Sequence, residues 1–71
     1  MTEQLAVGVV GVGSMGQHHA RVYQELPTVE LVGVADANEQ QAAETADRYG
    51  TTPLSVDSLL SVADAVSIVV P

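Results

Sequence analysis

Cysteine is absent from this 71-residue sequence, which excludes disulfide bonds, thiolate nucleophiles and cysteine-ligated metal sites. Signals for export or membrane insertion are lacking as well. No basic residue precedes the apolar stretch from Leu5 to Val12, as a signal peptide would require, and the stretch is far shorter than the roughly 20 apolar residues of a membrane span. We therefore expect a cytoplasmic protein without a membrane partner.

Lysine is also absent, and Arg21 and Arg48 are the only strongly basic side chains against nine acidic ones. The resulting formal net charge of −7 leaves no basic patch for nucleic acid or an anionic membrane surface. A lysine-free, acid-rich composition resembles that of proteins adapted to high salt, in which charge repulsion is screened over a few ångströms. We expect such an adaptation here.

Four apolar segments typical of strands alternate with three segments typical of helices. The strands are expected at 5–10, 30–35, 51–54 and 65–70, the third at a sheet edge because Pro53 lacks a backbone donor. The alternation predicts an α/β fold, a Rossmann-like doubly wound parallel sheet of strand order 3-2-1-4. Because the fourth strand is apolar and has no later strand to cover it, we expect residues 1–71 to be the N-terminal part of a dinucleotide-binding domain.

The first two helices have recognisable boundaries and faces. The first should begin near Met15 and stop before Pro27, and the second should have a capping box of Asn38 and Gln41 and a left-handed stop at Gly50. An exposed ion pair is expected between Glu44 and Arg48. The faces expected to be buried are Met15, His19, Val22, Tyr23 and Leu26 in the first helix, and Ala42, Ala43, Ala46 and Tyr49 in the second.

The turn after the first strand matches G-x-G-x-x-G. Gly11 allows the tight turn, Gly13 lets a pyrophosphate approach the backbone, and Gly16 lets helix and strand pack closely. Free amides at the helix start can hold phosphate without a lysine. A glycine-rich turn can also be purely structural, but the strand before it, the helix after it and the later acid favour a dinucleotide site. The turn residues expected to bind the cofactor are Gly11, Val12, Gly13, Ser14, Met15 and Gly16.

The acid in question is Asp36, which ends the second strand 20 residues after Gly16. Its carboxylate can accept hydrogen bonds from the adenosine ribose and would repel a 2′-phosphate, and no arginine follows at Ala37 or Asn38. NAD is therefore expected over NADP, with Asp36 and Ala37 beside the cofactor. A simple role in capping the second helix is the alternative, and both roles can coexist.

Neither histidine indicates a catalytic or metal site. His18 and His19 are neighbours on a helix, so their side chains point about 100° apart and cannot bind one ion together. His19 is expected to pack in the core and His18 to be solvated. No nucleophile, metal-binding or P-loop motif is present. We therefore predict a cofactor-binding unit without catalytic residues and without a metal.

Three motifs in register, GVGSMGQHHARVY, ELVGVADAN and DAVSIVVP, resemble the Gfo/Idh/MocA family of oxidoreductases over essentially the whole sequence. HHARVY combined with DAVSIVVP is most similar to dehydrogenases of sugar nucleotides within that family. The resemblance implies a Rossmann domain followed by a second domain that binds a sugar or cyclitol and builds a homo-oligomer. It also implies that Pro71, with Val70 before it, lies near the cofactor.

The resemblance places the chemistry elsewhere in such an enzyme. The catalytic lysine of the family belongs to a Glu-Lys-Pro motif that this sequence lacks, and the other acid-base residues belong to the absent substrate domain. We therefore expect the 71 residues alone to be inactive. Two alternatives remain open. One is a non-catalytic module that binds NAD and signals to a partner, and the other is a methyltransferase, whose cofactor site also uses a glycine turn and an acid.

Overall fold

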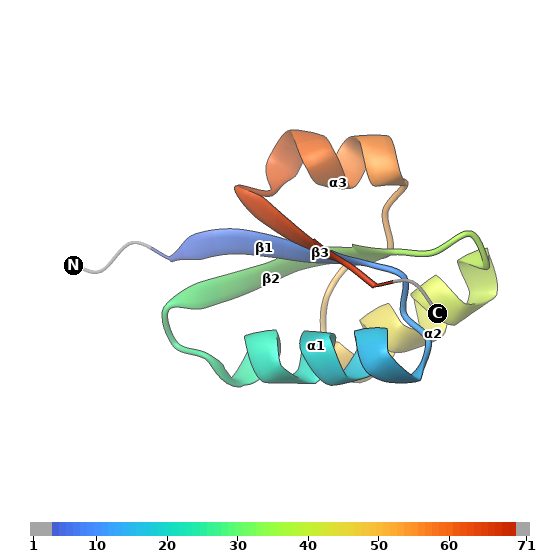
Figure 1. Ribbon diagram of the computed structural model, residues 1–71, viewed down its shortest axis with the longest axis horizontal. Helices are drawn as coiled ribbons and strands as arrows, with labels where there is room; N and C mark the ends of the chain where they lie inside the picture. The colour runs from blue at the N-terminus through green and yellow to red at the C-terminus, as the bar shows by residue number, and fades with distance from the viewer. Residues whose placement is uncertain (1–3, 70–71) are drawn as a thin grey trace.

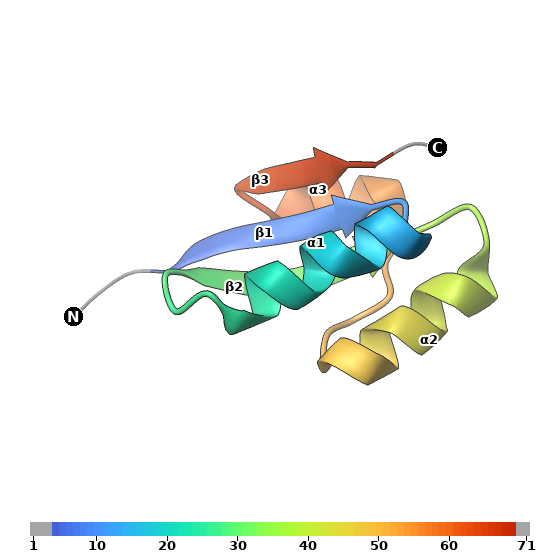
Figure 2. The same ribbon diagram turned by 60° about the horizontal axis from the view of Figure 1, so that its bottom comes forward.

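The computed structural model describes residues 4–69, which form a three-stranded parallel sheet with helices on both faces (Figure 1). Helices α1 and α2 cover one face and α3 covers the other, as the rotated view makes clear (Figure 2). The elements in chain order are β1 (Leu5–Val10), α1 (Ser14–Glu25), β2 (Val29–Ala35), α2 (Glu39–Tyr49), α3 (Val56–Val62) and β3 (Ala65–Ile68). The predicted doubly wound α/β fold is confirmed.

Strand β1 lies in the centre of the sheet, in the order β2-β1-β3. Its last residue, Val10, is paired with Ala35 of β2 and with Ile68 of β3. The carboxyl ends of all three strands therefore meet at one edge, which is where open α/β sheets bind their ligands. The register of β1 against β2 shifts once, between Val7 and Gly8.

The third expected strand, at 51–54, is reduced to a single parallel bridge between Pro53 and Val34. Val34 donates to the Thr52 carbonyl and accepts from the Leu54 amide, on the side of β2 away from β1. This is the expected position in the order 3-2-1-4, but Pro53 has no N–H with which to extend a ladder. The fourth expected strand is present as β3 and ends at Ile68, whereas Val70 and Pro71 lie outside the described residues.

The core is a small cluster of aliphatic side chains between the sheet and the helices α1 and α2. Its fully buried members are Val9, Val12, Ala20, Val34 and Ala46. Helix α1 turns its small residues Gly16 and Ala20 towards the sheet, so it lies close to the strands. Of its expected face, His19 and Tyr23 are half-buried, but Met15, Val22 and Leu26 are exposed. That expectation was wrong because a close approach through small residues leaves only a narrow buried strip.

Helix α2 has the predicted stop and the Asn38 half of the predicted capping box, but a different buried face. The Asn38 side chain accepts a hydrogen bond from the Gln41 amide at 3.0 Å, and Gly50 ends the helix with φ of 65°. Ala43 was expected to be buried but is exposed, whereas Thr45, which was not expected in the core, is buried. Thr45 lies one helical turn after the buried Ala42 and shares its face of the helix, but Ala43 directly follows Ala42 and points to another side.

The predicted ion pair of Glu44 and Arg48 is replaced by two other contacts. Arg48 Nη1 donates to Gln17 Oε1 of α1 at 2.7 Å, and Glu44 accepts from Gln40. Helix α2 is therefore bonded to α1 through the side chain that was expected to pair along its own surface. Within residues 4–69, no helix has the length and apolar character needed to cross a membrane.

Candidate functional site

The candidate site is an open cavity of about 510 Å³ where the carboxyl ends of the strands meet the start of α1. Figure 2 shows the short connection that leads from β1 into α1 at this edge. Six of the residues predicted to bind the cofactor line the cavity, together with two that were not predicted. The lining residues are Gly11, Gly13, Ser14, Met15, Gly16, Asp36, Gln41 and Val69.

Gly11 and Gly16 are required by the geometry of the protein itself. Gly11 has a φ of +91°, which side chains rarely tolerate, and its amide donates to the Ala35 carbonyl at 2.7 Å. A Cβ atom on Gly16 would collide with the carbonyl oxygen of Gly11. These two glycines allow a tight turn followed by close packing of α1 on the turn.

Gly13 is different, because nothing in residues 4–69 requires a glycine there. Its φ of −69° is accessible to any residue, and no atom of these described residues lies within 4 Å of the position of an added Cβ. The missing side chain therefore leaves open space that borders the cavity. A bound group that approaches the backbone closely would use this space, as the pyrophosphate of a dinucleotide does.

The start of α1 also favours an anionic ligand. Gly13 occupies its N-cap position without a side-chain cap, whereas Asn38 caps α2 and Ser55 caps α3. The first-turn amides of an α-helix have no partner within the helix, and the first turn of α1 itself contains no acidic residue. Met15, in this first turn, is 61% exposed and borders the cavity instead of packing in the core.

Asp36 is anchored by two backbone amides. Its Oδ2 accepts from Val12 and its Oδ1 accepts from Asn38, both at 2.8 Å. The amide of Val12 first, and that of Asn38 second, hold the pKa of the Asp36 carboxyl below its usual range, against the opposing effect of burial. The ionised carboxylate supports the turn and the start of α2, and each oxygen keeps acceptor capacity for a ligand hydroxyl.

Gln41 and Val69 line the cavity although the sequence pattern did not point to them. Gln41 has the spacing of a capping-box residue, but its side chain donates to the Val12 carbonyl at 2.9 Å, while the Asn38 amide binds Asp36. Val69 follows β3, and its amide donates to Val10 at 2.8 Å. Long-range contacts of this kind leave no periodic signal in a single sequence.

The remaining predicted residues lie apart from the cavity lining. The Val12 side chain is fully buried in the core, so only its backbone takes part in the turn. Ala37 is exposed and does not line the cavity. Val70 and Pro71 lie outside the described residues.

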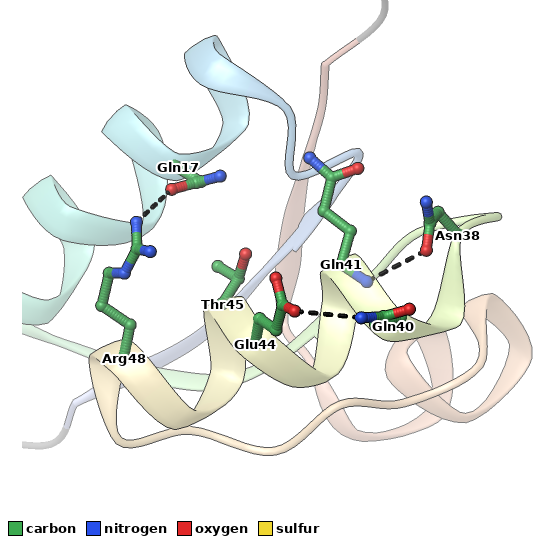
Figure 3. Close-up of a pocket in the computed structure, with 7 residues that line it drawn as sticks. All are labelled: Gln17, Asn38, Gln40, Gln41, Glu44, Thr45 and Arg48. Atoms are coloured by element: carbon green, nitrogen blue, oxygen red, sulfur yellow. Dashed lines mark hydrogen bonds between the residues drawn. The ribbon is translucent and has the colours of Figure 1, made fainter.

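A second, polar pocket of about 370 Å³ lies between α1 and α2, next to the turn (Figure 3). Gln17 reaches from α1 towards Arg48 of α2, and the two side chains are hydrogen-bonded (Figure 3). Gln41 lines both this pocket and the cavity at the glycine turn. The two hollows therefore share one lining side chain.

The two histidines of α1 contact different neighbours. His18 is exposed and lies 3.3 Å from an Arg21 nitrogen, and His19 packs edge-on against Tyr23 with ring centroids 6.4 Å apart. In the described part of the chain, no three His, Asp or Glu side chains are grouped so that they could hold a metal ion.

Comparison with protein families gives a match over residues 5–71 to the Gfo/Idh/MocA model, described as an oxidoreductase family with an NAD-binding Rossmann fold. A curated relative, UDP-N-acetylglucosamine 3-dehydrogenase of Acidithiobacillus ferrooxidans, is 44% identical over 68 residues, which are 94% of this chain and 21% of the relative. Inositol 2-dehydrogenase of Rubrobacter xylanophilus is 44% identical over 50 residues, which are 69% of this chain and 14% of the relative.

Solved structures similar to this chain include dehydrogenases of the same kind. The Acidithiobacillus ferrooxidans enzyme superposes with a TM-score of 0.90 at 43% identity, over 96% of this chain and 22% of that one. GenD2 from gentamicin A biosynthesis, in complex with NAD, superposes with a TM-score of 0.90 at 35% identity, over 100% of this chain and 21% of that one. The chain thus spans about a fifth of the length of these relatives.

Proposed function

Because this chain belongs to the Gfo/Idh/MocA family of oxidoreductases and has its NAD-binding Rossmann fold, we propose that its glycine turn and Asp36 bind the cofactor of a dehydrogenase for a sugar nucleotide or cyclitol. The open space at Gly13 is the observation that carries the proposal. No feature of the described part of the chain explains a glycine at this position, and a pyrophosphate lying against the backbone does.

In this proposal the pyrophosphate is bound by the glycine-rich loop and by the first helical turn of α1. The amides at the start of α1 supply donors and the positive end of the helix dipole, so no lysine is needed. The proposed pyrophosphate site consists of Gly11, Val12, Gly13, Ser14, Met15 and Gly16, with Val12 contributing only its backbone. When bound, the nicotinamide of the cofactor accepts or returns a hydride.

Asp36 determines the preference for NAD in this proposal. Its carboxylate, kept ionised by two amides, accepts hydrogen bonds from the ribose hydroxyls and repels a 2′-phosphate. Arg48 is engaged with Gln17, and no basic residue replaces it beside Asp36. Ala37, Val70 and Pro71 complete the proposed cofactor site by their positions after β2 and β3.

The substrate class is proposed from the relatives. Two of them are dehydrogenases of UDP-N-acetylglucosamine and of inositol, so a secondary alcohol on a sugar or cyclitol ring is the group to be oxidised. This chain has no lysine, so the catalytic lysine of the family's Glu-Lys-Pro motif would lie outside these residues. We propose that residues 1–71 alone have no dehydrogenase activity.

The larger setting follows from the same resemblance. We propose that these residues are the N-terminal part of a dinucleotide-binding domain in a cytoplasmic homo-oligomeric enzyme, with the substrate bound by a further domain. The short share of each relative that the chain spans supports this, as does β3, whose Ile68 is 70% exposed.

The proposal is tested with the full chain as its gene encodes it. NADH should bind more tightly than NADPH, and Asp36→Ala should narrow this difference in affinity. Addition of UDP-N-acetylglucosamine or myo-inositol should lead to reduction of NAD. Equal affinity of the unmodified protein for NADH and NADPH would refute the role of Asp36. NADH binding without turnover of either class would favour an NAD-responsive module, and tighter binding of S-adenosylmethionine than of NADH would favour a methyltransferase.

A further inference from the structure

The backbone of Val12, between the first two glycines of the turn, is bound entirely by side chains from other elements. Its amide donates to Asp36 Oδ2 at 2.8 Å. Its carbonyl accepts two hydrogen bonds, from Gln17 Nε2 of α1 at 3.2 Å and from Gln41 Nε2 of α2 at 2.9 Å. Three side chains from three elements therefore fix the orientation of this one residue.

The hydrogen bonds from the Gln17 and Gln41 side chains to the Val12 carbonyl also fix the orientation of the peptide group that joins Val12 to Gly13. In a trans peptide the C=O of one residue and the N–H of the next point in opposite directions. Since the Val12 carbonyl is directed towards Gln17 and Gln41, the N–H of Gly13 points away from them. Gly13 lines the cavity at the turn, Gln17 lines the polar pocket of Figure 3, and Gln41 lines both.

We propose that Gln41, together with Gln17, is a positioning residue that holds the Val12–Gly13 peptide with its N–H available to the cofactor pyrophosphate. The inference rests on the proposed function of the turn and assigns a role to a residue outside the G-x-G-x-x-G motif. Gln41 acts through Val12, whose carbonyl it binds, and its side chain also lines the cavity.

Both glutamines have their amide nitrogen directed to Val12 by other contacts. Arg48 donates to Gln17 Oε1 at 2.7 Å, which leaves the Gln17 nitrogen for the carbonyl (Figure 3). Gln41 occupies the third position of α2, where a glutamine usually reaches back to the N-cap amide. That amide, of Asn38, is already bound to Asp36, so the Gln41 side chain is available for Val12.

A carboxylate at position 41 would satisfy the capping pattern equally well but could not serve Val12. Glutamate suits the first turn of a helix, yet its ionised side chain accepts hydrogen bonds and donates none. Facing the Val12 carbonyl, it would repel rather than bind. Residue 41 can thus cap α2 or bind the Val12 carbonyl, and the sequence pattern S/T/N-x-x-E/Q does not distinguish these two roles.

The test compares Gln41→Met with Gln40→Met in the full chain, by calorimetric titration with NADH, ADP and adenosine. Gln40 is the adjacent exposed residue and bonds Glu44, so it is the matched control. Gln41→Met should weaken NADH and ADP binding about 3- to 10-fold, the effect of one lost neutral hydrogen bond, and should leave adenosine binding unchanged. Gln40→Met should match the unmodified protein.

Two further variants make the outcome decisive. Gln17→Met should show the same split between ADP and adenosine, and Gln41→Glu should weaken ADP binding at least as much as Gln41→Met does. Unchanged ADP affinity in Gln41→Met, or an equal loss for ADP and adenosine, would overturn the inference. If the unmodified protein binds neither NADH nor ADP, the proposed cofactor site itself is wrong, independently of the variants.

Discussion

The Asp36 carboxylate accepts a hydrogen bond from the Val12 amide at 2.8 Å, which joins the end of β2 to the middle of the glycine turn. The second oxygen of Asp36 accepts from the Asn38 amide and so supports the start of α2. The two interpretations of this acid, as a structural cap and as a ribose acceptor, are thus compatible in one side chain. The shape of the turn depends on a residue 24 positions away.

The first prediction concerns Asp36→Asn and pH. The folded-state pKa of Asp36 is lowered, so its contribution to stability is present above the usual aspartate pKa of about 3.9 and is lost as the pH falls through the folded-state value. Asparagine keeps one acceptor but faces the other amide with a donor. We expect Asp36→Asn to lower the free energy of unfolding by about 1 kcal/mol at pH 7, measured by urea denaturation.

The same comparison at acid pH provides the check on cause. The difference between Asp36→Asn and the unmodified chain should shrink as the pH falls from the usual aspartate pKa through the lowered folded-state pKa of Asp36, because both chains then lack the charge. Asp47→Asn removes one charge from an exposed position of α2 and serves as the control for general charge effects. A difference that stays constant with pH would show that the ionised form of Asp36 contributes nothing to stability.

The second prediction contrasts Gly13→Ala with Gly16→Ala. A methyl group at Gly13 meets no atom of residues 4–69 and φ is −69°, so Gly13→Ala should fold with unchanged or slightly higher stability. The methyl group would nevertheless occupy the space proposed for the pyrophosphate, and NADH affinity should fall at least about tenfold. At Gly16 the added atom collides with the Gly11 carbonyl, so Gly16→Ala should lower the thermal midpoint itself.

Thermal unfolding and NADH titration of both variants decide this prediction. Gly13→Ala with unimpaired NADH binding would remove the main support for the pyrophosphate site. A stable Gly16→Ala variant would mean that α1 can move away from the turn without cost. The pair also separates a binding defect from a folding defect, because only one of the two substitutions creates a clash within the protein.

Features encoded by neighbouring residues could be predicted from the sequence. The valine-rich run of β1, the spaced glycines and the cap at Asn38 are local signals, and the structure has each of them where expected. The pairs Gln41–Val12 and Arg48–Gln17 could not be predicted, because residues 29 and 31 positions apart meet only after α1 and α2 have packed on the sheet. The buried face of α1 was misjudged because hydrophobicity favoured Met15 over small residues that allow close packing.

The third prediction concerns the contact between Tyr23 of α1 and Ser67 of β3, whose hydroxyl groups are hydrogen-bonded at 2.5 Å. This bond joins α1 to the strand at the edge of the described sheet and is partly buried. A double-mutant cycle of Tyr23→Phe and Ser67→Ala should give a coupling energy of about 1 kcal/mol in urea denaturation. Strictly additive effects of the two substitutions would show that the hydroxyl pair does not stabilise the fold.

The fourth prediction concerns salt. With nine acids against two arginines, the formal net charge is −7, and repulsion between surface carboxylates opposes the compact state. Raising KCl from about 0.05 to 1 M shortens the screening length to about 3 Å and should raise the thermal midpoint by roughly 4 °C or more, equivalent to about 1 kcal/mol. Replacing exposed acids, as in Glu25→Gln with Asp47→Asn, should raise the midpoint in low salt and flatten its dependence on KCl. A midpoint that is constant or falls with added KCl would contradict the inferred adaptation to high salt, because repulsion would then not limit the stability of the chain.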